Sequence, residues 1–253
     1  MIDLQEIKNF FPPLVQQNPD QQVFMLKEYI LSQILEYISH SSFSNQLVFI
    51  GGTNLRLIKK IDRFSENVTF EGKGISATEY EEFVKGVVRY LQNYGYSVVL
   101  EEQKSDYREK KEVVLLLNDE RIMISVHDQE MEYLPQPVHV TTCGLRFPIL
   151  SPPDDILCAM KLSALLSRAK GRDFYDAMYL LSFTKPNYDF LLKRCGIGDE
   201  KQLIEALLAK SAETNLEQKQ SEFKRLLFNE MKSDQILEFP SFVENLEKIQ
   251  YFS

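Results

Sequence analysis

A short apolar run, Leu47-Val48-Phe49-Ile50, ends at two consecutive glycines, Gly51 and Gly52. Apolar runs of this length are typical of buried strands, and paired glycines indicate a tight turn directly after the strand. Residues 53–60 then predict a short helix with Thr53 as its N-cap, and the turn ahead of this helix exposes backbone N–H groups. This unit of strand, turn and helix constrains the chain to an α/β core.

The segment after this helix predicts a second strand, because polar and apolar residues alternate over residues 67–70. Val68 and Phe70 would point to one side of the strand, and Asn67 and Thr69 to the other. If the two strands are neighbours, the polar side faces the glycine turn. We therefore expect Asn67 and Thr69 to face Gly51 and Gly52.

Apolar residues recur at helical spacing over residues 21–39 and 78–94, which predicts two amphipathic helices. Further strands are expected at 96–101, 112–117 and 121–127. The last two of these strands would be joined by Asn118-Asp119-Glu120 as a hairpin turn. Together with the first two strands, these elements predict a mixed sheet flanked by helices over residues 1–150.

The pattern changes after residue 150, because Ser151-Pro152-Pro153-Asp154 starts a helical stretch and no strand pattern follows. We expect helices over residues 154–168, 172–183, 200–210, 217–232 and 240–249. The fold class is therefore α/β (α+β), with a core over residues 1–150 and a helical C-terminal region over residues 151–253.

The net charge of −8 argues against a protein that binds nucleic acid over its whole surface, because such binding needs many Lys and Arg contacts to phosphates. Two local basic clusters stay open as sites, although basic clusters are usually solvated faces. One consists of Arg56, Lys59, Lys60 and Arg63, and the other of Arg168, Lys170 and Arg172.

The N-terminal residues do not resemble a signal peptide, because Asp3, Glu6 and Lys8 interrupt the apolar positions. No apolar run approaches the roughly 18 residues that span a bilayer. The cysteines show neither metal-ligand spacing nor a disulfide framework. They are Cys143, Cys158 and Cys195. These features predict a cytoplasmic protein without a membrane partner.

Two segments carry the motifs that point to chemistry. Residues 49–70 begin with Phe-Ile-Gly-Gly-Thr-Asn-Leu-Arg and end with Arg-Phe-Ser-Glu-Asn-Val-Thr-Phe. Residues 161–176 read Lys-Leu-Ser-Ala-Leu-Leu-Ser-Arg-Ala-Lys-Gly-Arg-Asp-Phe-Tyr-Asp. The first segment resembles the Gly-Gly-Ser/Thr turn and the Arg-x-Ser-x-Asp-x-Asp motif of the AbiEii/AbiGii toxin family of nucleotidyltransferases. The second is similar to that family's Lys-x-x-Ala-x-x-x-Arg-x-Lys-x-Arg-Asp-x-x-Asp helix pair, and the resemblance covers most of residues 21–185.

The resemblance implies a nucleotidyltransferase-like fold and a nucleoside triphosphate as the bound cofactor. In the family, the Gly-Gly-Thr turn suits phosphates because it presents backbone N–H groups, and basic residues of the second segment neutralise the triphosphate. Catalytic roles are implied for Lys161, Asp173 and Asp176. Nucleotide-binding roles are implied for Gly51, Gly52, Thr53, Arg56, Ser65, Arg168 and Arg172.

The chain departs from the family at the metal site. The two aspartates that hold Mg²⁺ in the family are replaced by Asn67 and Thr69, and a further acid from a neighbouring strand aligns with Ser125. Glu71 lies on the same strand face as Asn67 and Thr69 by period-two alternation, so it is the local candidate for a replacement. A metal site at Asn67, Thr69 and Glu71 is therefore expected to be weak or absent.

Lys161 and Arg168 are seven residues apart on one helical face, and we expect both in the same cleft as Thr53. Asp173 and Asp176 lie one turn apart on a helix. They could orient Lys161 or Arg168, contact a ligand, or serve as helix-start charges.

Two functions stay open. The chain is either an active nucleotidyltransferase, similar to the toxin half of a toxin–antitoxin pair, or a degenerate relative that serves as a nucleotide-binding or regulatory module. The first alternative implies an RNA or protein acceptor for the nucleotidyl group, and a cognate antitoxin protein as a partner.

Overall fold

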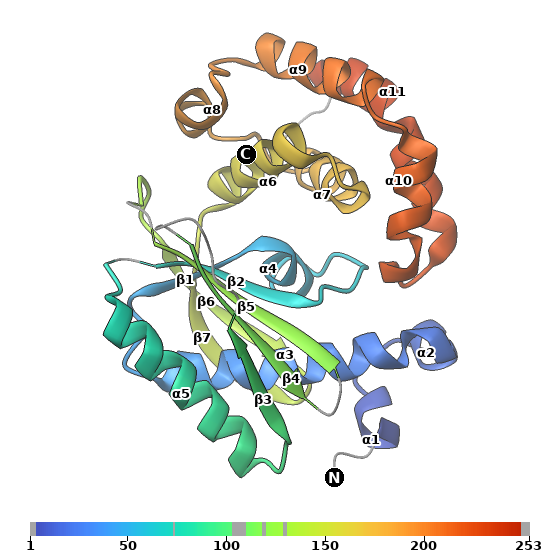
Figure 1. The fold of residues 1–253 in the computed structure, drawn as a ribbon. Coiled ribbons are helices and arrows are strands. Elements are labelled where there is room, and N and C mark those ends of the chain that lie inside the picture. Colours follow the sequence, from blue (N-terminus) through green and yellow to red (C-terminus); the bar gives the residue numbers. More distant parts are fainter. Residues whose placement is uncertain (1–3, 73, 103–109, 118–119, 129–130, 249–253) are drawn as a thin grey trace. The chain divides into compact units, whose positions relative to one another are not determined.

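The computed structural model describes residues 4–72, 74–102, 110–117, 120–128 and 131–248 (Figure 1). The chain divides into two compact units, Met1–Pro152 and Pro153–Ser253. The described strands all belong to the first unit, and the described elements of the second unit are helical. This confirms the expected α/β fold with a mixed sheet, flanking helices and a helical C-terminal region.

The described strands form one seven-stranded sheet in the order β3-β4-β5-β2-β1-β7-β6. Their bounds are β1 (Leu47–Ile50), β2 (Asn67–Gly72), β3 (Val98–Glu102), β4 (Lys110–Leu117), β5 (Glu120–Asp128), β6 (Gln136–Thr142) and β7 (Leu145–Ser151). The pairs β2–β5 and β1–β7 are parallel, whereas the other neighbouring pairs are antiparallel. The sheet is therefore mixed, with β1 and β2 at its centre.

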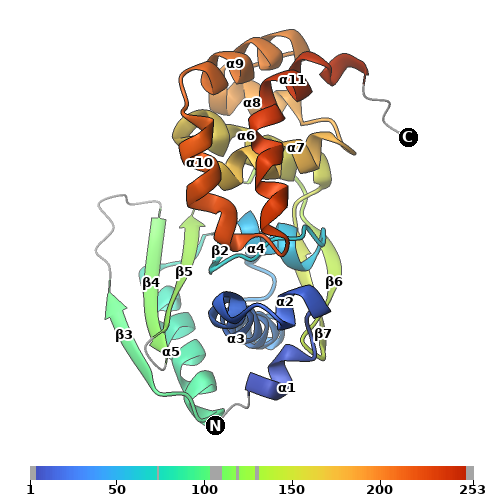
Figure 2. The same cartoon turned by 90° about the vertical axis from the view of Figure 1, so that its right-hand side faces the viewer.

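Two long helices cover one face of this sheet. The described helices of the first unit are α1 (Leu4–Lys8), α2 (Pro13–Gln16), η1 (Pro19–Gln21), α3 (Gln22–His40), α4 (Gly51–Leu57) and α5 (Ala77–Asn93). Ile34 of α3 and Val87 of α5 share one buried core with Phe49 and Phe70 of the central strands. In Figure 2, which looks nearly along α3, strands β4 and β5 lie on one side of this helix and β6 and β7 on the other. The sheet therefore bends around α3.

Alternation along β2 separates this core from the polar residues of the strand. Val68 and Phe70 point into the core, so Asn67, Thr69 and Glu71 lie on the opposite face of the sheet. Neighbouring strands extend this polar face, because β5 pairs in register with β2, and β4 pairs in register with β5. The opposite face of the sheet is therefore where a functional site can form in the first unit.

Two expectations about turns are wrong. The helix after the glycines begins at Gly51 rather than at Thr53, because the φ of +84° at Gly51 lets the chain enter the helix directly after Ile50. Ile50 is therefore the N-cap, and Thr53 lies inside the first turn. Glu120 was expected in the hairpin turn but belongs to β5, where it pairs with Leu117, while residues 118 and 119 lie outside the described residues.

The hairpin of β6 and β7 was not expected from the sequence pattern. Pro137 and Pro148 interrupt the strand signal, since proline is found in sheets mainly on edge strands or at bulges, and β6 is an edge strand. The turn of the hairpin consists of Cys143 and Gly144, both with positive φ (46° and 76°). Two consecutive residues of this kind are typical of the type I′ turns that join antiparallel strands.

The second unit is a bundle of short helices. The elements are α6 (Asp154–Arg168), α7 (Gly171–Leu181), α8 (Tyr188–Cys195), α9 (Glu200–Ala212), α10 (Leu216–Phe223), η2 (Lys224–Leu226), η3 (Glu230–Glu238), α11 (Phe239–Glu244) and η4 (Leu246–Lys248). The expected helices at 154–168, 172–183 and 200–210 correspond to α6, α7 and α9, whereas α8 was not expected. The segment 217–232 is divided between α10 and two 3-10 helices.

Close backbone packing and aromatic contacts hold this bundle together. A Cβ atom on Gly171 would lie 2.2 Å from the carbonyl oxygen of Lys219, so glycine lets α7 and α10 approach each other directly. Phe174 of α7 and Phe239 of α11 meet edge to face, with ring centroids 4.9 Å apart. None of the helices in the described part of the chain is long and apolar enough to cross a membrane.

Candidate functional site

The glycine turn between β1 and α4 is packed so tightly that neither position accepts a side chain without movement. A Cβ atom on Gly51 would lie 3.3 Å from Cβ of Thr69. A Cβ atom on Gly52 would lie 2.9 Å from Oγ of Ser65 and 3.0 Å from the guanidinium group of Arg63. Thr69 therefore faces the turn, and the segment before β2 packs against it.

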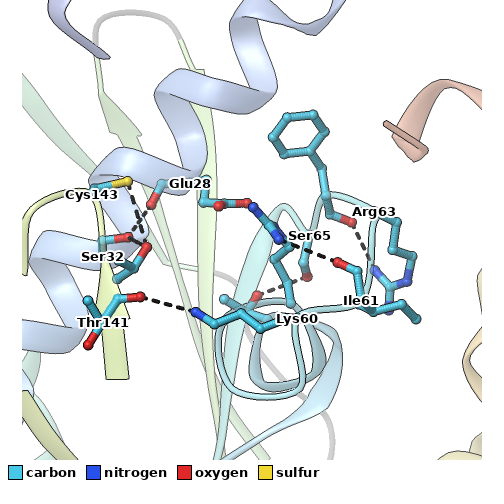
Figure 3. A network of polar contacts seen from close by, with 12 residues as sticks. Glu28, Ser32, Lys60, Ile61, Arg63, Ser65, Thr141 and Cys143 are labelled. Carbon is cyan, nitrogen blue, oxygen red and sulfur yellow. Dashed lines mark hydrogen bonds and ion pairs between the residues drawn. The ribbon is translucent and has the colours of Figure 1, made fainter. Parts of the chain in front are cut away.

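Hydrogen bonds tie the turn to that segment. The Thr53 hydroxyl donates to the carbonyl oxygen of Asn67 at 2.5 Å and lies 2.9 Å from Oγ of Ser65. The guanidinium group of Arg63, which is only 1% exposed, donates to the carbonyl oxygen of Phe64 at 2.9 Å. Figure 3 shows Arg63 and Ser65 in one network of polar contacts. Thr53 and Ser65 thus hold the backbone of the turn rather than capping a helix.

The first turn of α4 lacks a side-chain cap, because its N-cap residue is Ile50. The first N–H groups of a helix have no partner within the helix, and they attract anions. At the start of α4, no side chain of the N-cap residue competes for these backbone N–H groups.

The three positions that align with the family's acids, Asn67, Thr69 and Ser125, form a row on the polar face of the sheet. Oδ1 of Asn67 accepts a hydrogen bond from the backbone N–H of Met123 at 3.2 Å. Thr69 pairs in register with Ser125 of β5, and the Ser125 hydroxyl donates to Oε1 of Glu112 at 3.0 Å. All three are neutral, and two are engaged with protein groups. This donor set does not fit a two-Mg²⁺ centre, for which carboxylates supply most of the affinity.

Two carboxylates lie on the same face. Glu71 is 3% exposed, pairs in register with His127, and accepts a hydrogen bond from the Tyr133 hydroxyl. Glu112 of β4 pairs in register with Ser125. In the described part of the chain, however, no three His, Cys, Asp or Glu side chains gather as a metal site would require.

The sequence analysis did not identify Glu112 as a neighbour of Ser125. Its position depends on the register of the β4–β5 hairpin, in which Leu117 pairs with Glu120. The expected three-residue turn would pair Leu117 with Arg121 and shift the register by one residue, which moves Glu112 away from Ser125. A prediction that pairs Leu117 with Glu120 would have placed the acid correctly.

In the second unit, the residues of the second motif are joined in ion pairs. Nζ of Lys161 on α6 lies 2.9 Å from Oδ2 of Asp176 on α7. Both side chains are buried, with relative exposures of 8% and 0%. Lys161 is therefore held by Asp176 in the interior of the bundle.

A second pair joins the end of α6 to the start of α7. The Arg168 guanidinium donates two hydrogen bonds to the Asp173 carboxylate, at 2.9 and 2.7 Å, and the backbone N–H of Lys170 adds a third at 3.1 Å. The hydrogen bonds that Arg168 donates to Asp173 raise the pKa of Arg168, although its side chain stays 43% exposed. Arg172 is half-buried on α7, and its charge lowers the pKa of Lys170.

Arg56 lies in the last turn of α4, at the end opposite to the glycines. Its Nε atom lies 2.9 Å from Oε2 of Glu28 on α3. Burial raises the pKa of Glu28, and the charge of Arg56 opposes this shift. The nucleotide-binding role implied for Arg56 therefore competes with a structural role. Thr53 belongs to the first unit, and Lys161 and Arg168 belong to the second, so their common cleft stays a prediction.

One protein family and several solved structures match this chain. The family described as "Nucleotidyl transferase AbiEii toxin, Type IV TA system" matches residues 33–249. Among solved structures, MenT4, a nucleotidyltransferase toxin from Mycobacterium tuberculosis, is similar over 100% of both chains, with 16% identity and a TM-score of 0.60.

Two structures from Helicobacter pylori are also similar. JHP933 matches over 89% of this chain and 92% of its own, with 16% identity and a TM-score of 0.53. A putative nucleotidyltransferase matches over 90% and 98%, with 19% identity and a TM-score of 0.51. At these identities the structures show a shared fold. A comparison with curated proteins found no match.

Proposed function

Because this chain belongs to the AbiEii family of nucleotidyl transferase toxins, we propose that it binds a nucleoside triphosphate with little dependence on Mg²⁺ and transfers nucleotidyl groups very slowly. One observation carries this proposal. The positions that align with the family's acids hold neutral side chains, and Asn67 and Ser125 already make hydrogen bonds within the protein. This observation supports a site that lacks the metal-binding acids of the family motif, while the glycine turn of that motif is present.

The glycine turn supports phosphate binding. Gly51 and Gly52 are partly exposed, Ile50 offers no side-chain cap, and Thr53 and Ser65 hold the loop in place. Backbone N–H groups at a helix start attract phosphate oxygens without a metal ion. The turn would therefore orient the triphosphate.

The metal positions support slow transfer. With Asn67, Thr69 and Ser125 in place of three acids, the row lacks about three negative charges that would offset Mg²⁺. Metal ions accelerate phosphoryl and nucleotidyl transfer by stabilising the charge that develops on phosphate oxygens. A chain with a neutral row would bind nucleotide without stabilising this charge.

The second motif would contribute through its cations. Arg168 presents a half-exposed guanidinium whose orientation is fixed by Asp173, so we expect it to contact phosphate as a planar fork. Lys161 is buried against Asp176, and we expect it to orient a reacting group only if this pair separates. These roles, and those of Arg172, are part of the proposal.

The family description also guides the expected partners. The matching family belongs to a type IV toxin–antitoxin system, so we propose a cognate antitoxin protein as a partner, and an RNA or protein as acceptor if transfer occurs. Both would be met in the cytoplasm, where nucleoside triphosphates are present.

A radiolabelled transfer assay tests the proposal. The unmodified protein and an Asn67→Asp, Thr69→Asp double variant would be incubated with each labelled nucleoside triphosphate, bulk RNA and protein, with and without Mg²⁺. We expect very low labelling by the unmodified protein, and a Mg²⁺-dependent gain in the double variant, because two carboxylates return to β2. Robust Mg²⁺-dependent labelling by the unmodified protein would refute the proposal.

A second function is favoured by one contact. Glu112 of β4 brings a carboxylate to within 3.0 Å of the Ser125 hydroxyl. It could therefore supply the negative charge that Asn67, Thr69 and Ser125 lack. The chain would then be a Mg²⁺-dependent transferase with a displaced ligand. In the same assay, Glu112→Gln and Glu71→Gln would identify which carboxylate carries any Mg²⁺-dependent labelling.

A further inference from the structure

A separate cavity of about 210 Å³ lies in the first unit, at the end of α4 that is remote from the glycines. Its lining comes from stretches that are far apart in the sequence: Glu28 on α3, Arg56 and Lys60 at the end of α4, and the turn between β6 and β7. The fold therefore brings charged side chains together here that no sequence motif connects.

The described residues that line this cavity include two cations and one carboxylate. Arg56 is paired with Glu28 through its Nε atom at 2.9 Å, and their side chains are 14% and 4% exposed. Nζ of Lys60 donates to the carbonyl oxygen of Thr141 at 3.1 Å. Figure 3 shows Lys60 reaching Thr141, with Glu28 and Cys143 close by. The positive charge exceeds the negative charge of this lining by one unit.

The two cations disfavour each other. Burial, followed by the nearby charge of Arg56, lowers the pKa of Lys60. An anion placed between the two side chains would remove this repulsion and interact with both. Lys60 also has a φ of +63°, a conformation that non-glycine residues adopt rarely, so its backbone is held in an unfavourable region beside the cavity.

Protein contacts also fix the part of the lining that comes from the β6–β7 hairpin. The Ser32 hydroxyl donates to the carbonyl oxygen of Glu28 at 2.7 Å and lies 3.1 Å from the Thr142 hydroxyl. The Cys143-Gly144 turn closes the hairpin beside it. A cavity with a fixed wall loses little conformational freedom when a ligand binds.

We propose that this cavity binds a phosphate group, either as free phosphate or as a phosphate ester. Arginine offers a planar fork of donors and lysine a compact charge, and together they match a tetrahedral oxyanion. Glu28 would hold Arg56 in place through its Nε atom, although the negative charge of Glu28 in the same lining opposes the binding of an anion. The site differs from the glycine turn, and it does not depend on the function proposed above.

Calorimetric titration of the full chain at constant ionic strength tests this site, with inorganic phosphate in one arm and adenosine monophosphate in the other. Lys60→Gln should weaken binding about tenfold, since one charged hydrogen bond is lost. Lys59→Gln removes the same charge one residue away, outside the lining, and should change binding less than about twofold. Glu28→Gln removes the competing anion and should tighten binding. The arm with the tighter binding identifies the free ion or the ester.

Three outcomes would overturn the proposal. The first is the absence of binding in both arms. The second is an equal effect of Lys60→Gln and Lys59→Gln. The third is binding that is lost in Gly52→Ala but retained in Lys60→Gln, since it would place the phosphate at the glycine turn. Circular dichroism of each variant separates loss of binding from loss of fold.

Discussion

The two units balance charge in opposite ways. In the second unit, both motif carboxylates form ion pairs: Asp176 with Lys161 and Asp173 with Arg168. The donor–acceptor distances are 2.7–2.9 Å. In the first unit, the row of Asn67, Thr69 and Ser125 holds neutral side chains where the family motif has acids. The second unit keeps its motif charges in ion pairs, whereas the first unit has no charged side chain at these three positions.

A charged motif can therefore have a structural reason to persist. Removing either partner of a buried pair leaves an uncompensated charge, so the ion pairs of α6 and α7 stabilise the bundle whether or not the chain catalyses a reaction. Acids at positions 67 and 69 of β2 would point to the same face and would repel each other without a metal ion. The absence of acids at positions 67 and 69 is therefore more informative about activity than the presence of Lys161 or Asp176.

The largest effect is expected for Asp176→Asn. Lys161 would stay buried without its counter-charge, so the free energy of unfolding should fall by about 3–5 kcal/mol. Urea denaturation followed by circular dichroism measures this loss. Glu205→Gln, an exposed carboxylate on α9, serves as the control and should change stability by less than about 0.5 kcal/mol. A loss below about 1 kcal/mol for Asp176→Asn would contradict a structural role for the buried pair.

Gly52→Ala tests the packing of the turn in the first unit. The new Cβ atom would displace Ser65 or the buried Arg63, so we expect a loss of about 1–3 kcal/mol in the same experiment. Gly198→Ala is a matched control, because its Cβ atom would meet its neighbours at 3.5 Å or more. If both variants are equally stable, the turn is looser than the contacts indicate.

Asp173→Asn should cost less than Asp176→Asn, about 1–2 kcal/mol. Arg168 is 43% exposed, so water can replace part of the lost ion pair, whereas the buried Lys161 has little such access. The order of the two urea midpoints is the test. A greater loss for Asp173→Asn would show that the more exposed pair is the stronger one, which is the reverse of the expected order.

The smallest effect is expected for Ala169→Gly, and it is a gain. Ala169 ends α6 with a φ of +47°, a left-handed conformation that glycine adopts without steric cost. We expect stabilisation by about 0.5–1 kcal/mol, measured as an increase in the urea midpoint. Destabilisation would show that the methyl group makes contacts that outweigh the strain.

Patterns that depend on local periodicity predicted much of the fold. The bounds of α6 match the expected helix over 154–168, and the alternation over residues 67–70 placed Thr69 beside Gly51. Elements with mixed signals were missed, since Pro137 and Pro148 concealed the β6–β7 hairpin. The start of α4 was misplaced because a positive φ at Gly51 cannot be read from the residue type alone.

The sequence predicted only those residues of the candidate site that lie within one contiguous motif. The motifs identified the glycine turn and the basic residues of α6, but Glu112 and the Glu28–Arg56 pair depend on contacts between distant segments. Glu112 required the correct hairpin register, and Glu28 required the packing of α3 beside α4. No periodic signal in either segment contains that information.

Titration calorimetry with each nucleoside triphosphate, in Mg²⁺ and in EDTA, directly tests whether nucleotide binding is independent of the metal. If the neutral row contributes no metal site, the dissociation constants in the two conditions should differ by less than about threefold, and the Asn67→Asp, Thr69→Asp variant should acquire a Mg²⁺ dependence. Tighter binding in Mg²⁺ by about tenfold or more in the unmodified protein would contradict metal-independent binding and direct attention to Glu71 and Glu112.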